Sequence, residues 1–178
     1  MPLTPLHPGV SLPFFIAFRR RLEIIPLVIG SMVSDLEILF MMPFTGWDIR
    51  FRGPMHSLIG AVSIDSAVAL FISFAIFPFI GRWVKARYGK LRYHIFAGKD
   101  VTEAPKSFGA AAFSASLGAL THVLWDAWSH PYNPLLWPWD NVPGLNFAPP
   151  GDPFFVMLFS QLLTAMMLAL LLEMYWRL

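Results

Sequence analysis

The most informative pattern in the sequence is a histidine, an aspartate and a second histidine spaced four residues apart, at His122, Asp126 and His130. On an α-helix each step of four residues turns about 40° and rises about 6 Å, so the three side chains share one face. A histidine and an aspartate at i and i+4 can bind one divalent ion, as in other helical metal motifs. Because His130 would lie ~12 Å along the axis from His122, we expect it to serve a second ion or to contact substrate. The alternative is a structural His–Asp pair within a buried polar network.

Further residues of metal-ligand type lie in or next to long apolar runs. Asp35 and Glu37 lie in the first run, and His56 opens the second. An ionisable side chain at the bilayer centre costs about 2.5–3.5 kcal/mol or more, so each is a candidate for function. His7 belongs to a short apolar segment that precedes the first run. A helix over the rest of that segment would rise only ~16 Å, which places His7 near mid-depth of a bilayer.

Four long apolar runs must position these residues. They cover approximately 22–42, 56–81, 108–128 and 154–176. Each approaches or exceeds the ~20 residues that a helix needs to cross ~30 Å of hydrocarbon. The composition agrees, because 56% of the residues are hydrophobic and only 13% are charged, whereas a soluble domain carries roughly 25% charged residues. We therefore predict a single all-α domain over 1–178, an integral membrane bundle of about four transmembrane helices with 2–18 as a half-membrane or re-entrant segment.

Loop charge orients the predicted bundle in the inner or plasma membrane. The loop over 82–107 holds seven lysines and arginines, whereas the loop over 129–153 holds none. The positive-inside rule places the first loop in the cytoplasm and the second outside. Ligand-type residues from three separate runs then reach one level near the outer face, which favours a shared site over scattered polar contacts. Asp65 lies deeper and is predicted to support a histidine by a hydrogen bond or to make a polar contact between helices.

The residue types present restrict the chemistry of such a site. The sequence contains no cysteine, which excludes disulfides and thiolate metal ligands. Histidine and carboxylate ligands suit zinc, with manganese or iron as alternatives. The uneven basic charge sets membrane topology rather than nucleic-acid binding. Tryptophans flank the predicted site and either seat a lipid or anchor the bundle at the interface: Trp125, Trp128, Trp137 and Trp139.

These motifs resemble the DUF4184 family over nearly the whole chain. The resemblance lies in the opening through His7 and Pro8, in the stretch from Ile29 to Glu37, and in the stretch from Leu117 to Pro131. The chain also looks related to the predicted membrane-bound, metal-dependent hydrolases called DUF457 or YdjM-like proteins. Their Asp-x-Asp and Arg-Gly-x-x-His-Ser elements read Asp35-Leu36-Glu37 and Arg52-Gly53-Pro54-Met55-His56-Ser57 here.

More remotely, the order of histidines and aspartates is similar to that of zinc-dependent phospholipase C and P1 nuclease, which are all-helical enzymes that hydrolyse phosphoesters. This resemblance implies one or two zinc ions and metal-site residues at His7, Asp35, His56, His122, Asp126 and His130. It implies hydrolysis of a phosphoester such as a phospholipid or a lipid-linked phosphate by metal-activated water. Asp35 would be a ligand or the general base, and Glu37 the alternative base.

Two other classes of function use the same residues. A divalent-metal or proton transporter would use the charged cluster as a relay, and an oligomer of so small a bundle would then form the channel. A structural membrane protein would use the polar set to specify helix pairing, and it would carry no stoichiometric metal. In each case we expect membrane lipid as the surroundings and no nucleic-acid partner.

Overall fold

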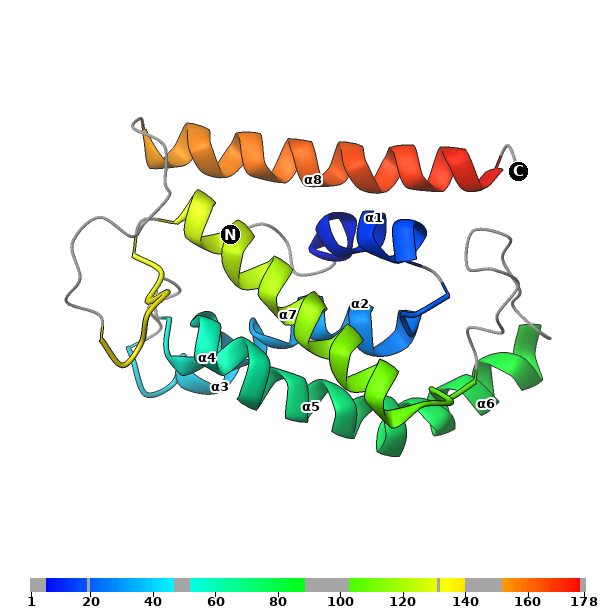
Figure 1. Cartoon of the computed structure of the whole chain (residues 1–178). Helices are drawn as coiled ribbons and strands as arrows, with labels where there is room; N and C mark the ends of the chain where they lie inside the picture. The colour runs from blue at the N-terminus through cyan, green and yellow to red at the C-terminus, as the bar shows by residue number, and fades with distance from the viewer. Residues whose placement is uncertain are drawn as a thin grey trace.

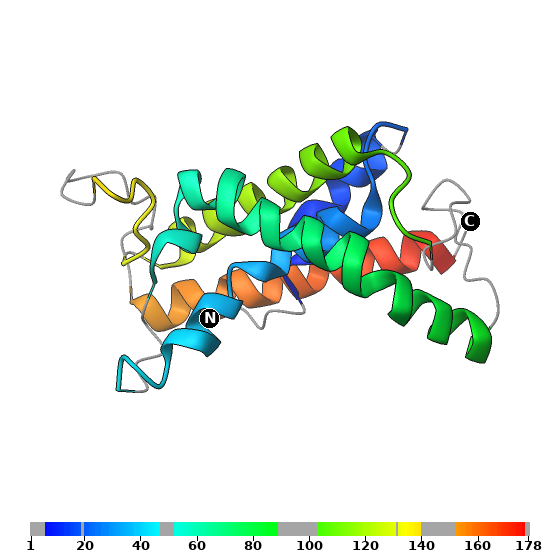
Figure 2. The same cartoon turned by 90° about the horizontal axis from the view of Figure 1, so that it is seen from below.

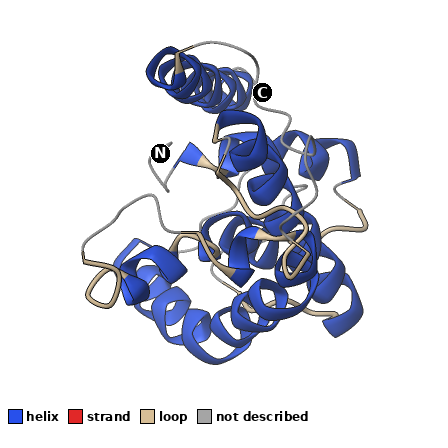
Figure 3. Ribbon diagram, turned by 90° about the vertical axis from the view of Figure 1, so that its left-hand side faces the viewer, coloured by secondary structure: helices blue, strands red, loops and turns tan. Residues whose placement is uncertain are grey.

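The protein is helical throughout the part that the computed structural model describes, which is 6–18, 20–46, 52–88, 103–130, 132–139 and 152–176. Figure 3 shows helices and loops, and no strand, in those residues. The helical elements in chain order are α1 (Pro8–Phe18), α2 (Ile24–Val33), α3 (Leu36–Met41), η2 (Pro54–His56), α4 (Leu58–Gly60), η3 (Ala61–Asp65), α5 (Ser66–Phe71), η4 (Ile72–Ile76), α6 (Phe77–Tyr88), α7 (Phe108–Ser129) and α8 (Pro153–Trp176). This confirms the predicted all-α class.

Within the described residues, three helical segments are long and apolar enough to cross a membrane: Ile24–Met41, Leu58–Arg87 and Phe108–Ser129. They correspond to the first three predicted runs. The fourth run forms the 24-residue helix α8, of which Phe154–Ala169 is described with its side chains as a shorter apolar helix. A fourth crossing, and insertion in a membrane, therefore stay predictions.

The first two spans are not regular α-helices. The first changes from α2 to α3 at Ser34 and Asp35, where the chain makes a turn. The second runs without a break from α4 to α6 but contains two π-helical stretches, η3 and η4. Such irregularities shift side chains around the helix axis and are frequent at functional sites. The turn in the first span directs Asp35 into the bundle, where it is 6% exposed.

The centre of the bundle is the close packing of α2 against α7, which crosses the molecule diagonally in Figure 1. Glycine makes this approach possible. A Cβ at Gly30 would collide with the carbonyl oxygen of Ala115, and one at Gly118 with that of Leu27. Small residues at a helix interface allow backbones to approach in this way. α7 is thereby fixed beside the turn that carries Asp35.

The helix ends fall at two poles of the molecule. In Figure 1 the end of α3, the start of α4, the end of α7 and the start of α8 gather at the left, whereas α6 ends at the right. Figure 2, seen from below, shows the same separation. The short helix α1 lies between α8 and the rest of the bundle and ends toward the right.

Candidate metal centre

Four buried side chains from three parts of the chain converge on one point. Asp35, His56, His122 and Asp126 each offer one ligand atom, and these atoms lie within 4.8 Å of one another. His122 Nε2 is 3.7 Å from Asp35 Oδ1 and 3.8 Å from Asp126 Oδ2. His56 Nε2 is 3.8 Å and 3.9 Å from the same two oxygens. The four residues come from the α2–α3 turn, from η2 and from α7, so tertiary packing is required to assemble them.

The hydrogen bonds of the two histidines fix which ring nitrogen faces the centre. His122 Nδ1 lies 2.9 Å from the carbonyl oxygen of Ser31, and a carbonyl can only accept, so Nδ1 carries the proton. His56 Nδ1 lies 3.0 Å from Glu37 Oε2 and donates in the same way. Both Nε2 atoms therefore direct a lone pair at the point between the two aspartates. This is the tautomer that a metal-binding histidine needs, held by a hydrogen bond from its other nitrogen.

The atoms at this point lack hydrogen-bond partners. His56 Nε2, His122 Nε2 and both carboxylate oxygens of Asp126 are buried, and none has such a partner within the described part of the chain. Each unsatisfied buried group costs about 1–3 kcal/mol, and more when charged. Four acceptors that face one another also repel. A divalent cation removes both costs, because it is the missing partner for all four groups.

The spacing agrees with one ion of ordinary size. Four donors at about 2.0–2.2 Å from a tetrahedral zinc ion lie about 3.3–3.6 Å from one another. The nitrogen–oxygen separations of 3.7–3.9 Å exceed this by a few tenths of an ångström. Small side-chain movements would close that difference. The cluster can therefore hold a divalent metal, and its two histidines and two carboxylates do not by themselves select zinc over manganese or iron.

His7 lies directly against the four-residue set. Its Nδ1 is 3.5 Å from Asp35 Oδ2, and its Nε2 is 3.5 Å from Asp126 Oδ1. Its ring centroid is 4.0 Å from that of His122. His7 thus bridges the carboxylate oxygens that point away from the two metal-facing histidines. The structure brings this residue to the cluster from α1.

Glu37 is turned toward the backbone of the following segment. Its carboxylate accepts hydrogen bonds from the Gly53 amide at 2.8 Å and the Met55 amide at 3.3 Å, in addition to the bond from His56. A Cβ at Gly53 would stand 2.5 Å from Glu37 Oε1, so a larger residue there would displace the carboxylate. Glu37 holds the η2 turn and orients His56.

His130 lies just past the end of α7 rather than on it. The helix ends at Ser129, and the His130 amide donates to the carbonyl of Asp126 at 2.7 Å. The imidazole stacks on Tyr132 at 5.3 Å between ring centroids. Burial lowers the pKa of His130 to about 4, so the ring is neutral at pH 7. The structure places it beside the four-residue set and outside it.

Sequence reasoning missed Arg52 as a site residue. Its side chain is 1% exposed, and its Nε lies 3.5 Å from Asp126 Oδ2. The Arg-Gly-x-x-His-Ser element was the signal that could have found it.

Asp65 makes the interhelical contact rather than supporting a histidine, since the Ser34 hydroxyl donates to Asp65 Oδ2 at 2.5 Å.

Aromatic residues lie at the same pole. The tilted rings of Trp125 and Trp128 lie 5.3 Å apart, and Trp128 lies 6.1 Å from Phe159 of α8, measured between ring centroids. Trp139 is 64% exposed. A lipid seat or interfacial anchoring is consistent with this position, as the sequence predicts.

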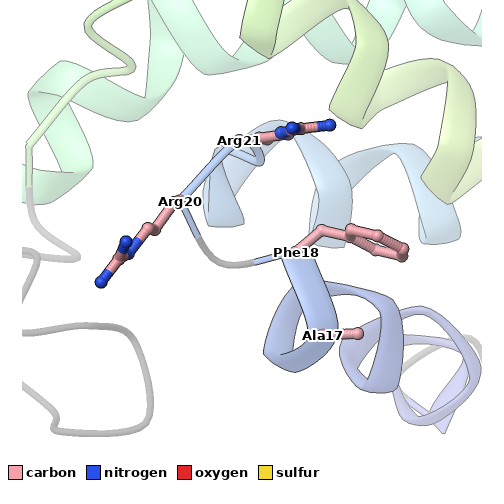
Figure 4. A pocket seen from close by; sticks show the side chains of 4 residues that line it. All are labelled: Ala17, Phe18, Arg20 and Arg21. Carbon is pink, nitrogen blue, oxygen red and sulfur yellow. The ribbon is translucent and has the colours of Figure 1, made fainter.

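A separate cavity of about 430 Å³ lies between the end of α1 and the start of α2. Its lining consists of Ala17, Phe18, Arg20 and Arg21 (Figure 4). Both arginines are exposed. The cavity lies at the end of α1 opposite to His7, so it is not part of the metal cluster.

Fold and site together define a class: helical proteins with three potential membrane spans and a buried histidine–aspartate cluster that could hold a metal ion. Residues 1–177 match the family model described as "Domain of unknown function (DUF4184)", and the chain belongs to that family. No curated protein and no solved structure matches the chain. The activity must therefore be argued from the site itself.

Proposed function

We propose that this protein is a membrane-bound, metal-dependent hydrolase that acts on a phosphoester such as a phospholipid or a lipid-linked phosphate. The observation that carries the proposal is the set of unpartnered buried ligand atoms of His56, His122 and Asp126, which face Asp35 across one small space. The resemblance to DUF457 proteins and to zinc-dependent phospholipase C supplies the reaction class. Zinc is the ion that we propose, with manganese and iron as alternatives, because histidine and carboxylate ligands without cysteine suit all three.

The surface supports placement in a bilayer. Large apolar side chains are exposed on several helices: Phe40 is 71% exposed, Phe71 63%, Phe79 64%, Phe113 62% and Leu162 62%. A water-soluble monomer rarely exposes so many large apolar side chains to this extent, and lipid would cover them. In the proposed orientation α8 is the fourth crossing, 82–107 is cytoplasmic and the metal centre opens near the outer face.

Each residue of the site has a distinct role in the proposed reaction. His56 and His122 bind the ion through Nε2, and Asp126 and Asp35 Oδ1 balance its charge. When bound, the ion would lower the pKa of a coordinated water toward about 7 and stabilise negative charge on phosphoryl oxygens. Asp35 Oδ2, which faces His7, is placed to accept a proton. Glu37 is the weaker candidate for the base, because it already accepts three hydrogen bonds.

The polar groups farther from the cluster favour a one-sided site over a transport path. The Ser66 hydroxyl donates to the Ala61 carbonyl at 2.7 Å and lies 2.8 Å from the Ser116 hydroxyl. The Ser73 hydroxyl donates to the Ala69 carbonyl at 2.6 Å. Hydroxyls that bond to their own helix in this way are not placed to pass an ion or a proton onward.

Elemental analysis of protein purified without added metal is the first test. We expect one or two equivalents of a divalent metal, lost in His122→Ala and kept in His94→Ala. His94 is the matched control, because it belongs to the basic segment 82–107 in the sequence and to none of the predicted ligand motifs. Wild-type protein without metal would remove the hydrolase proposal and leave the structural alternative.

Turnover is the second test. Release of phosphate or headgroup from lipid in detergent should be abolished by a chelator and by Asp35→Asn. Metal flux into liposomes with no release of phosphate would instead identify a transporter that uses the same cluster.

A further inference from the structure

Arg52 is the only buried lysine or arginine in the described part of the chain. Two contacts hold its guanidinium beside the metal centre. Nε lies 3.5 Å from Asp126 Oδ2, and Cζ lies 5.8 Å from the centroid of the Tyr132 ring. A buried arginine is costly unless its charge is used. Its position next to one of the four ligand residues suggests a role in the chemistry of the site.

Charge balance shows what Arg52 changes for an incoming anion. Asp35, Glu37 and Asp126 carry three negative charges in a buried region. A divalent ion supplies two positive charges, and Arg52 supplies the third. With all histidines counted as neutral, the filled site without Arg52 would keep one negative charge, which would repel an anionic substrate at low dielectric. Arg52 removes that charge, and its guanidinium is an oriented donor for oxyanions.

His130 adds a second group on the same side. It is 3% exposed, and its Nε2 has no hydrogen-bond partner within the described residues. It stacks on Tyr132, the ring over which Arg52 also lies. The Tyr132 ring therefore contacts both Arg52, which precedes η2, and the His130 imidazole at the end of α7. An unpartnered nitrogen of this kind indicates a ligand, because buried polar groups are otherwise paired.

We propose that Arg52, His130 and Tyr132 form an oxyanion subsite that holds the phosphoryl group of the substrate beside the metal centre. The planar guanidinium fork matches two phosphoryl oxygens, whereas an ammonium group acts as a point charge. His130, with its proton on Nε2, donates to a further oxygen of the same group. This assignment rests on the proposed function and names the part of the substrate that the site recognises.

The test uses the full-length protein in detergent, loaded with Co²⁺ as a spectroscopic probe of the centre. Inorganic phosphate and a short-chain phosphatidic acid are titrated separately, and the visible absorption of Co²⁺ is recorded. We expect a saturable change in the wild type. Arg52→Lys should weaken anion affinity by at least about tenfold with Co²⁺ stoichiometry unchanged, because the fork is lost while the charge is kept. The matched control is Arg21→Lys, an exposed arginine at the far end of α1, which should bind as wild type.

The two titrations also identify the source of the phosphoryl group. Tighter binding of phosphatidic acid supports a lipid headgroup, and tighter binding of inorganic phosphate supports a small soluble phosphate. If Arg52→Lys fails to bind Co²⁺, the variant His130→Gln tests the subsite instead. It should bind Co²⁺ with wild-type stoichiometry and bind the anion more weakly than the wild type. Co²⁺-loaded wild type that responds to neither anion would overturn the subsite, as would wild-type affinity in both variants. Failure of the wild type to bind Co²⁺ would instead refute the metal centre.

Discussion

Removing the negative charge of Glu37 tests how the metal-facing histidine is positioned. Glu37→Gln is nearly isosteric, yet glutamine has one acceptor oxygen where the carboxylate has two. The carboxylate now accepts from the Gly53 amide, the Met55 amide and His56 Nδ1. Oε2 accepts from both Gly53 and His56, so the glutamine oxygen keeps that place and the NH₂ group meets the Met55 amide. The bond from His56 Nδ1 then ends on a neutral amide instead of a carboxylate, which holds the ring less firmly and lowers the basicity of Nε2.

The expected loss follows from the bonds that are broken. Hydrogen bonds to a charged group contribute about 1.5–3 kcal/mol each, and mutations of the partners that orient metal-binding histidines typically cost about 10–100-fold in metal affinity. We therefore predict a 10–100-fold weaker affinity for Zn²⁺ in Glu37→Gln. Competition with a chromogenic chelator in detergent measures it. Glu103→Gln is the control, because the Glu103 side chain is 46% exposed and lies far along the chain in the basic loop.

The affinity and the stoichiometry of metal binding together show whether Glu37 positions His56 or acts as a general base. A weakened affinity with unchanged metal stoichiometry supports orientation of His56 by Glu37. Wild-type affinity in Glu37→Gln would show that the negative charge of Glu37 does not support the metal-facing histidine, and this prediction would be wrong. A general base would behave differently again, since its loss would lower turnover and leave affinity unchanged.

Three further outcomes are expected. Gly118→Ala should destabilise the protein by about 1–3 kcal/mol in detergent denaturation, because the new methyl group meets the Leu27 carbonyl. Gly109→Ala is the control and should not destabilise it, because the space around Gly109 is open. Wild-type stability of Gly118→Ala would contradict the close packing of α2 on α7. Free Zn²⁺ at about 100 times its Kd should stabilise the wild type by about 2.7 kcal/mol, seen as a higher melting temperature that His122→Ala does not show. His7→Ala should keep at least one equivalent of metal, because all four members of the set remain; complete loss would make His7 an essential ligand.

Local properties of the chain predicted much of the fold. The first three apolar runs appear as candidate spans, because the length of an apolar helix and its match to a bilayer depend on composition alone. The pair His122 and Asp126 was predicted to share a face, because helical periodicity fixes that relation before any packing. The DUF4184 family was identified from short motifs distributed along the chain.

Periodicity failed at the point where the helix stops. His130 continues the four-residue spacing of α7 in the sequence, yet it caps the helix with φ −133° and ψ 107°. Its ring therefore lies against Tyr132 rather than in line with His122 and Asp126. A cap changes the direction of a side chain, and the spacing of residue types does not reveal where the last turn ends.

The sequence by itself determined the apolar helices and the residue types available for a metal, since these follow from hydropathy, periodicity and composition. Only the tertiary structure decided which groups meet. It assigned the inward nitrogen of His56 and His122, the turn of Glu37 toward the backbone, and the burial of Arg52. These depend on contacts between residues far apart in the chain, and the close approach of α2 to α7 that creates them is a property of the packed bundle.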